Sequence, residues 1–191
     1  MKLLKPVAVA FFLTAFNFTP ALAKTGLEQR GAFCDLNRMK PIKNGDQAPV
    51  FSLTDQNGKN FTLKSVLGKK NIVIYFYPKN ETPGCTAEAC AFRDQYEEFT
   101  KVGAEVIGIS ADSVKSHEDF TKNRKLPFVL LSDPDNVVRK LYGVPGAMFG
   151  TMPGRVTYVV DKKGVVRHVF NSLLHATKHV DEALKVLQGF D

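Results

Sequence analysis

Tryptophan is absent from this chain of 191 residues, and its lysines and arginines are scattered among acidic residues without forming one long basic run. The formal net charge of +7 therefore does not indicate a nucleic-acid partner, because no basic segment is combined with aromatic residues. Internal repeats and low-complexity tracts are also missing. The length and a hydrophobic content of 44% fit one ordinary globular domain.

Cysteine is scarce, with only Cys34, Cys85 and Cys90 in the chain. Three cysteines are too few for a small domain held together by disulfides, and the aliphatic content makes such a scaffold unnecessary. The odd number leaves one cysteine over if two of them pair. The close pair in TPGCTAEAC (82–90) has three possible explanations, which are a metal site, a structural disulfide and a redox couple.

Long hydrophobic runs are missing as well. The apolar run at 7–16 follows Lys2 and Lys5 and leads to the small-residue pattern Ala-Leu-Ala at 21–23. This run is shorter than the roughly 20 residues that span a bilayer, so residues 1–23 are predicted to be a cleaved export signal and not an anchor. Removal of the two lysines lowers the formal charge from +7 to +5.

Export places the mature chain in a compartment that tolerates disulfides. The periplasm is expected, with secretion and the thylakoid lumen as alternatives, and no membrane association is expected after cleavage. Residues 24–43 form an extension without sustained periodicity, and residues 44–191 form the domain. Cys34 in the extension is interpreted as an unpaired thiol or as one half of an intermolecular disulfide. It lies too far downstream for a lipoprotein signal.

The order of hydrophobic patterns predicts an α/β fold with a mixed central sheet flanked by helices and an N-terminal hairpin. The run NIVIYFY is continuous and β-branched, as expected of a strand buried on both faces. The predicted elements are a short hairpin closed by Asn57-Gly58, a central strand at 71–77, a helix at 83–101, a strand at 104–110, a polar helix at 113–125, an apolar run at 126–133, a short helix around 137–141, an antiparallel hairpin at 155–170 and a last helix carrying Val180, Leu184 and Leu187.

A metal site at the cysteine pair is not expected. A closed tetrahedral zinc site needs four ligands, and the chain has no second cysteine pair. His175 and His179 are four residues apart and could share one face of a helix, but no glutamate follows His175 as a metalloprotease motif requires. They are interpreted as two solvated histidines near the start of the last helix.

A resting disulfide conflicts with helical geometry. Two residues five apart on an ideal helix have Cα atoms about 8.7 Å apart. A disulfide needs a separation below roughly 7 Å. If residues 85–90 are helical when reduced, the cysteines can join only after the first turn unwinds. Such coupling favours a pair that cycles between thiols and disulfide.

The start of the helix favours a reactive sulfur at Cys85. Thr82 followed by Pro83 is typical of an N-cap with proline at the first helical position. Cys85 then lies in the first turn, where free amides and the helix dipole stabilise a negative charge. Cys90 lies a turn and a half deeper and is expected to be more buried and to ionise less readily. The alternatives are an inert cysteine at 85 and simple core packing by Cys90.

Two segments resemble peroxiredoxins, and in particular the peroxiredoxin Q group, also called bacterioferritin comigratory proteins. YFYPKNETPGCTAEACAFRD (75–94) carries that family's Pro-x-x-x-Thr-x-x-Cys arrangement as Pro78, Thr82 and Cys85. GVPGAMFGTMPGRVTYVVDKKGVV (143–166) resembles the group's second signature, with Arg155 at the position of the catalytic arginine. The two matches occur in the family's order, and the resemblance extends over nearly the whole mature chain.

The resemblance implies a thioredoxin-like fold and thiol-dependent reduction of hydrogen peroxide and organic hydroperoxides. It implies that Cys85 is the peroxidatic cysteine and Cys90 the resolving cysteine, supported by Pro78, Thr82 and Arg155. The resulting intrachain disulfide would be reduced by thioredoxin or a similar dithiol donor. No cofactor is implied, and a monomer is expected.

Each supporting residue also has a simpler interpretation. Thr82 could only cap the helix, Pro78 could only end the strand, and Arg155 could only be a surface base. Two rival functions remain. An exported thioredoxin-like disulfide oxidoreductase would normally carry Cys-x-x-Cys, and a metal-binding module on the same fold would need a histidine beside the cysteines.

Overall fold

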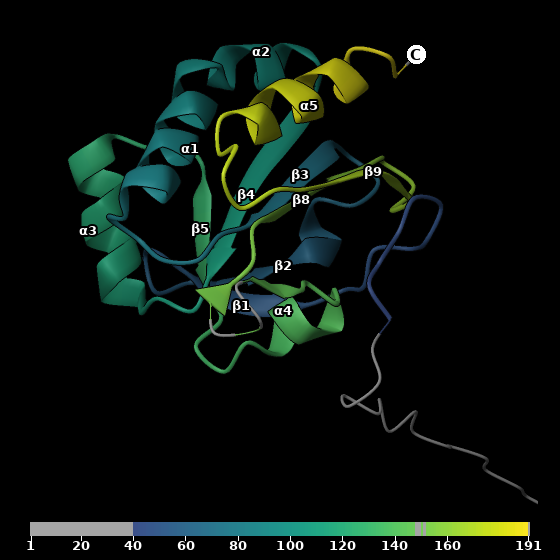
Figure 1. Ribbon diagram of the computed structural model, residues 1–191. Helices are drawn as coiled ribbons and strands as arrows, with labels where there is room; N and C mark the ends of the chain where they lie inside the picture. The colour runs from purple at the N-terminus through teal and green to yellow at the C-terminus, as the bar shows by residue number, and fades with distance from the viewer. Residues whose placement is uncertain (1–39, 148–149, 151, 191) are drawn as a thin grey trace, which may run out of the picture. The chain divides into compact units, whose positions relative to one another are not determined.

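The computed structural model describes residues 40–147, 150 and 152–190 of the chain (Figure 1). The predicted export signal, nearly all of the predicted extension and Cys34 lie outside the described residues. No helix in these described ranges combines the length and the apolar character that crossing a membrane requires.

The centre of the domain is a mixed β-sheet, as the sequence predicts. Its strands are β1 (Ser52–Asp55), β2 (Asn60–Thr62), β3 (Asn71–Phe76), β4 (Ala104–Ser110), β5 (Val129–Ser132), β8 (Val156–Val160) and β9 (Val166–Asn171). The described strands follow the order β2-β1-β5-β4-β3-β8-β9. β3, β4 and β5 are parallel, whereas β8 runs antiparallel to β3 and pairs with β9 in the predicted hairpin.

Helices connect the parallel strands and cover the sheet (Figure 1). They are α1 (Pro83–Asp94), α2 (Tyr96–Lys101), α3 (Val114–Arg124), α4 (Val137–Leu141) and α5 (Lys178–Leu187), with a 3-10 turn η2 (Leu63–Ser65). A separate pair of short strands, β6 (Gly146–Ala147) and β7 (Met152–Pro153), lies before β8. The predicted hairpin at Asn57-Gly58 is formed by β1 and β2, and Gly58 takes the positive φ of 75° that its turn requires.

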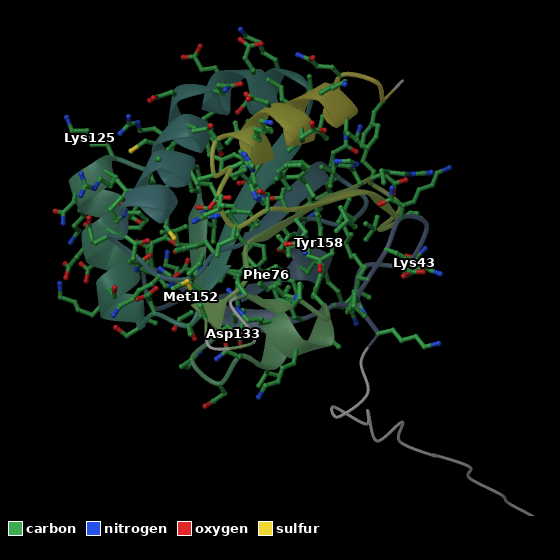
Figure 2. The ribbon with its side chains drawn as sticks, viewed as in Figure 1. Lys43, Phe76, Lys125, Asp133, Met152 and Tyr158 are labelled. Atoms are coloured by element: carbon green, nitrogen blue, oxygen red, sulfur yellow. The ribbon has the colours of Figure 1, made fainter. Side chains whose placement is uncertain are left out.

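The core lies on both faces of the sheet, because successive side chains of a strand point to opposite faces. On β3, Val73 and Tyr75 belong to the cluster under α1, α2 and α5. Ile74 and Phe76 belong to the cluster on the other face, where the Phe76 and Tyr158 rings lie 5.9 Å apart (Figure 2). β3 is therefore buried on both faces, as its continuous apolar run predicts.

The predicted single helix at 83–101 is two helices. α1 ends at Asp94, and Gln95 leaves the helical conformation with φ −105° and ψ 10° before α2 begins. The break allows both Phe92 and Phe99 to be fully buried, with ring centroids 5.6 Å apart. Tertiary packing has overridden the regular spacing that predicts one helix.

The interpretation of His175 and His179 as two solvated histidines is wrong for His179. α5 begins at Lys178, so His175 precedes the helix and the two residues do not share a helical face. His179 has 0% exposure because it lies on the face of α5 that packs onto the sheet, beside the buried Val180. Its ring makes an edge contact with Phe170 at 4.7 Å.

Candidate active site

The sheet brings two distant segments to one edge. β3 and β8 are antiparallel neighbours in which Phe76 is paired with Val156. Pro78, which follows β3, and Arg155, which precedes β8, therefore meet at the same end of the sheet. Pro78 ends the strand and is half-buried.

The helix that carries the cysteines begins as the sequence predicts. Thr82 has the extended backbone of an N-cap, with φ −76° and ψ 147°, and Pro83 is the first helical residue. The Thr82 hydroxyl makes no capping hydrogen bond and donates instead to the Lys79 carbonyl at 3.1 Å. Cys85 thus lies in the first turn, where it is only 2% exposed.

Arg155 reaches Cys85 directly. Its Nη2 atom donates to Cys85 Sγ at 3.3 Å, and its Nε atom donates to the Leu173 carbonyl at 3.3 Å. Arg155 is 3% exposed, so the alternative interpretation as a surface base is wrong. A guanidinium at this distance stabilises a negative charge on the sulfur, because few water molecules can screen the pair.

Gly84 leaves room for this approach. A Cβ atom added at Gly84 would lie 3.3 Å from Arg155 Nη2, closer than an ordinary van der Waals contact. The glycine therefore opens the first turn of α1 to the guanidinium. It also weakens the helix.

Glu88 is a site residue that the sequence does not single out. It is fully buried and accepts a hydrogen bond at Oε2 from Arg155 Nη1. Burial raises the pKa of Glu88 to about 8, although Arg155 opposes the shift. Burial would lower the pKa of Arg155, but Glu88 and Cys85 together raise it. Glu88 follows Cys85 by three residues, a spacing that places both on one helical face and could have indicated the contact.

A family model described as the AhpC/TSA family matches residues 44–169 of the chain. The chain belongs to the AhpC/TSA family. Chloroplastic peroxiredoxin Q of Populus jackii is 55% identical over 148 residues, which cover 78% of this chain and 69% of that protein. The chloroplastic peroxiredoxin Q of Sedum lineare is 56% identical over 148 residues, which cover 78% of this chain and 79% of that protein.

Solved structures give the same assignment. The crystal structure of peroxidoxin BcpB from Mycobacterium tuberculosis matches with a TM-score of 0.73 and 37% identity, covering 78% of this chain and 99% of that one. A structure of Xanthomonas campestris peroxiredoxin Q matches with a TM-score of 0.66 and 34% identity, and the match covers 72% of this chain and 89% of that one. The chain is therefore a peroxiredoxin of the peroxiredoxin Q group, with a thioredoxin-like fold and the activity of a thiol-dependent peroxidase.

Both cysteines of the close pair are free thiols in this peroxiredoxin, and α1 holds them in one continuous helix. The predicted order of burial is wrong, because Cys85 is buried and Cys90 is half-buried. Arg155 and core residues of the sheet cover Cys85. No group of three or more metal-ligating side chains occurs among the residues that the structure describes.

A second buried arginine fixes the two active-site segments to each other. Arg139 donates to the Tyr77 carbonyl at 2.7 Å and to the Gly154 carbonyl at 2.9 Å. Tyr77 immediately precedes Pro78, and Gly154 immediately precedes Arg155. Burial lowers the pKa of Arg139, which nevertheless remains far above neutrality in an arginine. Nothing in the sequence patterns predicts this role.

The loop before α1 rests on a buried polar network. The backbone N–H of Asn80 donates to the Asp112 carboxylate at 2.9 Å, and the side-chain amide of Asn80 donates to the Ser116 hydroxyl at 2.9 Å. The Tyr77 hydroxyl donates to Asn80 at 2.8 Å. His117 lies in the same network with 0% exposure, and burial lowers its pKa to about 4.

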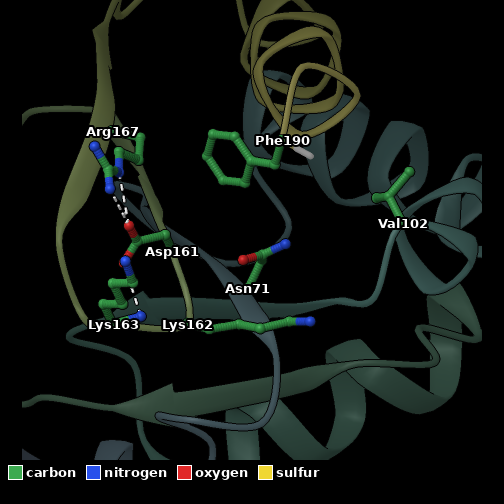
Figure 3. Close-up of a pocket in the computed structure, with 7 residues that line it drawn as sticks. All are labelled: Asn71, Val102, Asp161, Lys162, Lys163, Arg167 and Phe190. Carbon is green, nitrogen blue, oxygen red and sulfur yellow. Dashed lines mark hydrogen bonds and ion pairs between the residues drawn. The ribbon is translucent and has the colours of Figure 1, made fainter.

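A cavity of about 470 Å³ lies away from this site (Figure 3). Asn71 in its wall is the first residue of β3, whereas Pro78 follows the other end of that strand. Arg167 and Asp161 form an ion pair in the wall at 2.6 Å. Its lining residues are Asn71, Val102, Asp161, Lys162, Lys163, Arg167 and Phe190, none of which belongs to the active-site segments.

Proposed function

We propose that Cys85 is the peroxidatic cysteine and that Arg155, Thr82 and Pro78 support its reaction. The observation that carries this assignment is the 3.3 Å contact between Arg155 Nη2 and Cys85 Sγ in a site from which water is nearly excluded. A similar solved structure, that of the bacterioferritin comigratory protein of Xanthomonas campestris, belongs to a protein described as having alkyl peroxide reduction activity, which supports hydroperoxides as substrates.

In the first step, the Cys85 thiolate attacks the terminal oxygen of a hydroperoxide. The S–O bond forms, the O–O bond breaks, and the leaving alkoxide takes up a proton to become an alcohol, or water when the substrate is hydrogen peroxide. Arg155 stabilises the thiolate and the charge that develops on the leaving oxygen. Pro78 and Thr82 lie on the loop that borders the helix start, where they limit the access of water to the sulfenic acid.

In the second step, Cys90 resolves the sulfenic acid. Its thiolate attacks Cys85 Sγ, so that an S–S bond forms, the S–O bond breaks, and hydroxide leaves as water after protonation. Because ideal helical geometry separates the two Cα atoms by about 8.7 Å, the first turns of α1 have to unwind before this bond can form. Gly84 in the first turn lowers the free energy of that unwinding.

An external dithiol, thioredoxin or a relative, would then reduce the intrachain disulfide.

We propose an exported monomer whose residues 1–23 are removed, with the periplasm as its compartment and secretion or the thylakoid lumen as alternatives. The plant relatives are chloroplastic by name, which is compatible with a luminal location. Cys34 remains proposed as an unpaired thiol or an intermolecular partner, and lies outside the described residues.

Two serine variants test the assignment. We expect Cys85→Ser to abolish peroxide consumption, and Cys90→Ser to consume one equivalent of peroxide and stop at the sulfenic acid. The ferrous-xylenol orange assay measures the peroxide, and mass spectrometry locates the added oxygen. Equal turnover by the unmodified protein and both variants would refute the assignment of both cysteines.

A further inference from the structure

A buried guanidinium bridges the two segments that carry the proposed reacting groups. Arg139, on α4, is only 7% exposed. Its Nη2 atom donates to the Tyr77 carbonyl at 2.7 Å, and its Nη1 atom donates to the Gly154 carbonyl at 2.9 Å. Arginine is seldom buried, because its charge then loses the stabilisation that water provides. The position therefore requires an explanation beyond the filling of space.

Each accepting carbonyl belongs to the peptide plane that begins a proposed site residue. A peptide unit is planar, so a hydrogen bond that fixes its carbonyl also fixes the nitrogen of the next residue. The next residues are Pro78, which leads to the start of α1, and Arg155, whose Nη2 atom donates to Cys85 Sγ at 3.3 Å. Arg139 thus braces the backbone on both sides of the contact between guanidinium and sulfur.

Both peptide planes offer little else by which they could be held. Pro78 has no N–H, so the peptide unit after Tyr77 can form hydrogen bonds only through its carbonyl. Gly154 has no side chain, and a Cβ atom added there would lie 2.1 Å from the Pro145 carbonyl oxygen. The close approach of these two backbones therefore requires glycine. The two carbonyl oxygens are the groups that remain for Arg139 to bind.

Arg139 is itself held at its base and along its length. The Asp133 carboxylate, which follows β5, accepts hydrogen bonds from the backbone N–H groups of Val137, Val138 and Arg139 at 2.8, 3.3 and 2.9 Å. The guanidinium carbon lies 5.6 Å from the centre of the Phe76 ring, a cation–π distance. A side chain fixed in this way can hold two carbonyls at a constant separation.

We infer that Arg139 is a positioning residue for the reaction with peroxide, because it sets the distance and direction between the Arg155 guanidinium and Cys85 Sγ. The inference rests on the proposed role of Cys85. Arg139 makes no hydrogen bond to the sulfur in the part of the chain that the structure describes, so its effect passes through Arg155. A displacement of about 1 Å in a reacting geometry can slow a reaction about 10²-fold.

The first test replaces the planar fork and keeps the charge. Rapid-quench mass spectrometry measures the rate at which hydrogen peroxide oxidises Cys85 in the full chain carrying Cys90→Ser. Arg139→Lys retains a positive charge but cannot hold two carbonyls with one rigid group. We expect the rate of oxidation to fall about 10²-fold. The matched control is Arg167→Lys, a surface arginine at the other end of the sheet, which should leave the rate unchanged.

Alkylation by iodoacetamide distinguishes positioning from a general loss of thiolate. It consumes the same sulfur, but no O–O bond breaks, and its dependence on pH gives the ionised fraction of Cys85. Both rates can then be expressed per thiolate. We expect Arg139→Lys to slow oxidation per thiolate and not to slow alkylation per thiolate. Equal losses in both reactions would overturn the inference.

A double-mutant cycle tests whether the effect passes through Arg155. Arg139→Lys is added to a chain that already carries Arg155→Lys, in which the guanidinium that should be positioned is absent. Because the two changes share one interaction, we expect the further loss of rate to be much smaller than in the parent. The same loss with and without Arg155 would show that Arg139 acts elsewhere, and the inference would be wrong.

The outcomes separate the inference from the proposed function. If Cys85 of the parent chain gains no oxygen, the proposed function itself fails. If Cys85 gains the oxygen and Arg139→Lys reacts at the parent rate, the inference is wrong and the peroxidatic role stands. Circular dichroism verifies that each variant is folded. If Arg139→Lys and Arg139→Met both fail to fold, Arg139 supports the domain and not the site, which overturns the inference as well.

Discussion

At the scale of single residues, the site depends on a side chain with several donors in fixed directions. Arg155 uses Nη2 for Cys85, Nη1 for Glu88 and Nε for the Leu173 carbonyl. A lysine carries one ammonium group on a flexible stem and cannot reach three partners that lie on different sides. The geometry therefore requires arginine at this position and not merely a positive charge.

Arg155→Lys should accordingly slow the oxidation of Cys85 by peroxide about 10²- to 10³-fold, the usual effect of removing one donor that stabilises developing charge. Rapid-quench mass spectrometry of the Cys90→Ser protein isolates this step. The matched control is Arg167→Lys, a surface arginine paired with Asp161, which should leave the rate unchanged. A lysine variant within threefold of the parent would show that charge alone is sufficient.

Sequence patterns locate the proposed reactive residues but not their buried partners. Cys85, Thr82 and Arg155 belong to motifs, so the spacing within each motif and the order of the motifs in the sequence identify them. Glu88 on a helix and His179 near a helix start resemble solvated residues, because charge is normally exposed. α5 packs against α1 and β8. The apolar stripe of α5 predicts that one of its faces is buried, but not which elements that face contacts.

At the scale of elements, α1 has to satisfy two opposing requirements. In the proposed mechanism, it must remain helical to place Cys85 at a helix start, and it must unwind after oxidation to let Cys90 approach. Gly84 in the first turn and Ala87 on the exposed side of the helix are positions at which helix stability can be changed without altering either cysteine. The sequence predicts the start of α1 correctly, whereas the break at Gln95 follows from the burial of two aromatic rings.

Gly84→Ala should stabilise α1 by about 1 kcal/mol and slow disulfide formation about fivefold. A longer-lived sulfenic acid meets more peroxide, so more Cys85 should reach the irreversible sulfinic acid. Because the new methyl group approaches Arg155 Nη2, the formation of the sulfenic acid and the formation of the disulfide must be measured separately, by rapid quench and mass spectrometry of the products.

Ala87→Gly provides the matched change of opposite sign. It should weaken α1 by a similar free energy, accelerate disulfide formation and reduce overoxidation. If both variants changed the resolving phase in the same direction, helix unwinding would not limit that step.

At the scale of the whole molecule, the sheet order creates the site. Cys85 and Arg155 are 70 positions apart in the sequence, and they meet because β8 returns antiparallel beside β3. Apolar runs and turns predict the strands individually, as for β3 and the β8–β9 hairpin. The order of strands cannot be obtained from those runs, because each buried strand could pair with several others.

The same burial makes the stability of the whole domain depend on pH. The pKa values of His117 and His179 are lowered from 6.5 to about 4 in the folded chain, mainly because burial disfavours the charged ring. Between pH 6.5 and 4 the unfolded chain therefore binds more protons at both histidines. Their contribution to stability is fully present above pH 6.5 and is lost as the pH falls toward 4. Glu88 contributes in the opposite sense, because its raised pKa gives stability at low pH that is lost as the pH rises through about 8.

His117→Gln should therefore remove about half of the histidine-dependent loss of stability between pH 6.5 and 4, while its amide keeps hydrogen-bonding capacity toward Asn80 and Tyr77. Each histidine contributes at most about 3 kcal/mol over this range. Urea unfolding at a series of pH values measures the slope, and the exposed His175→Gln should leave it unchanged. An acid-side slope that is equal in His117→Gln and in the parent would mean that His117 is already charged in the folded domain, or that the domain opens around it before the rest unfolds.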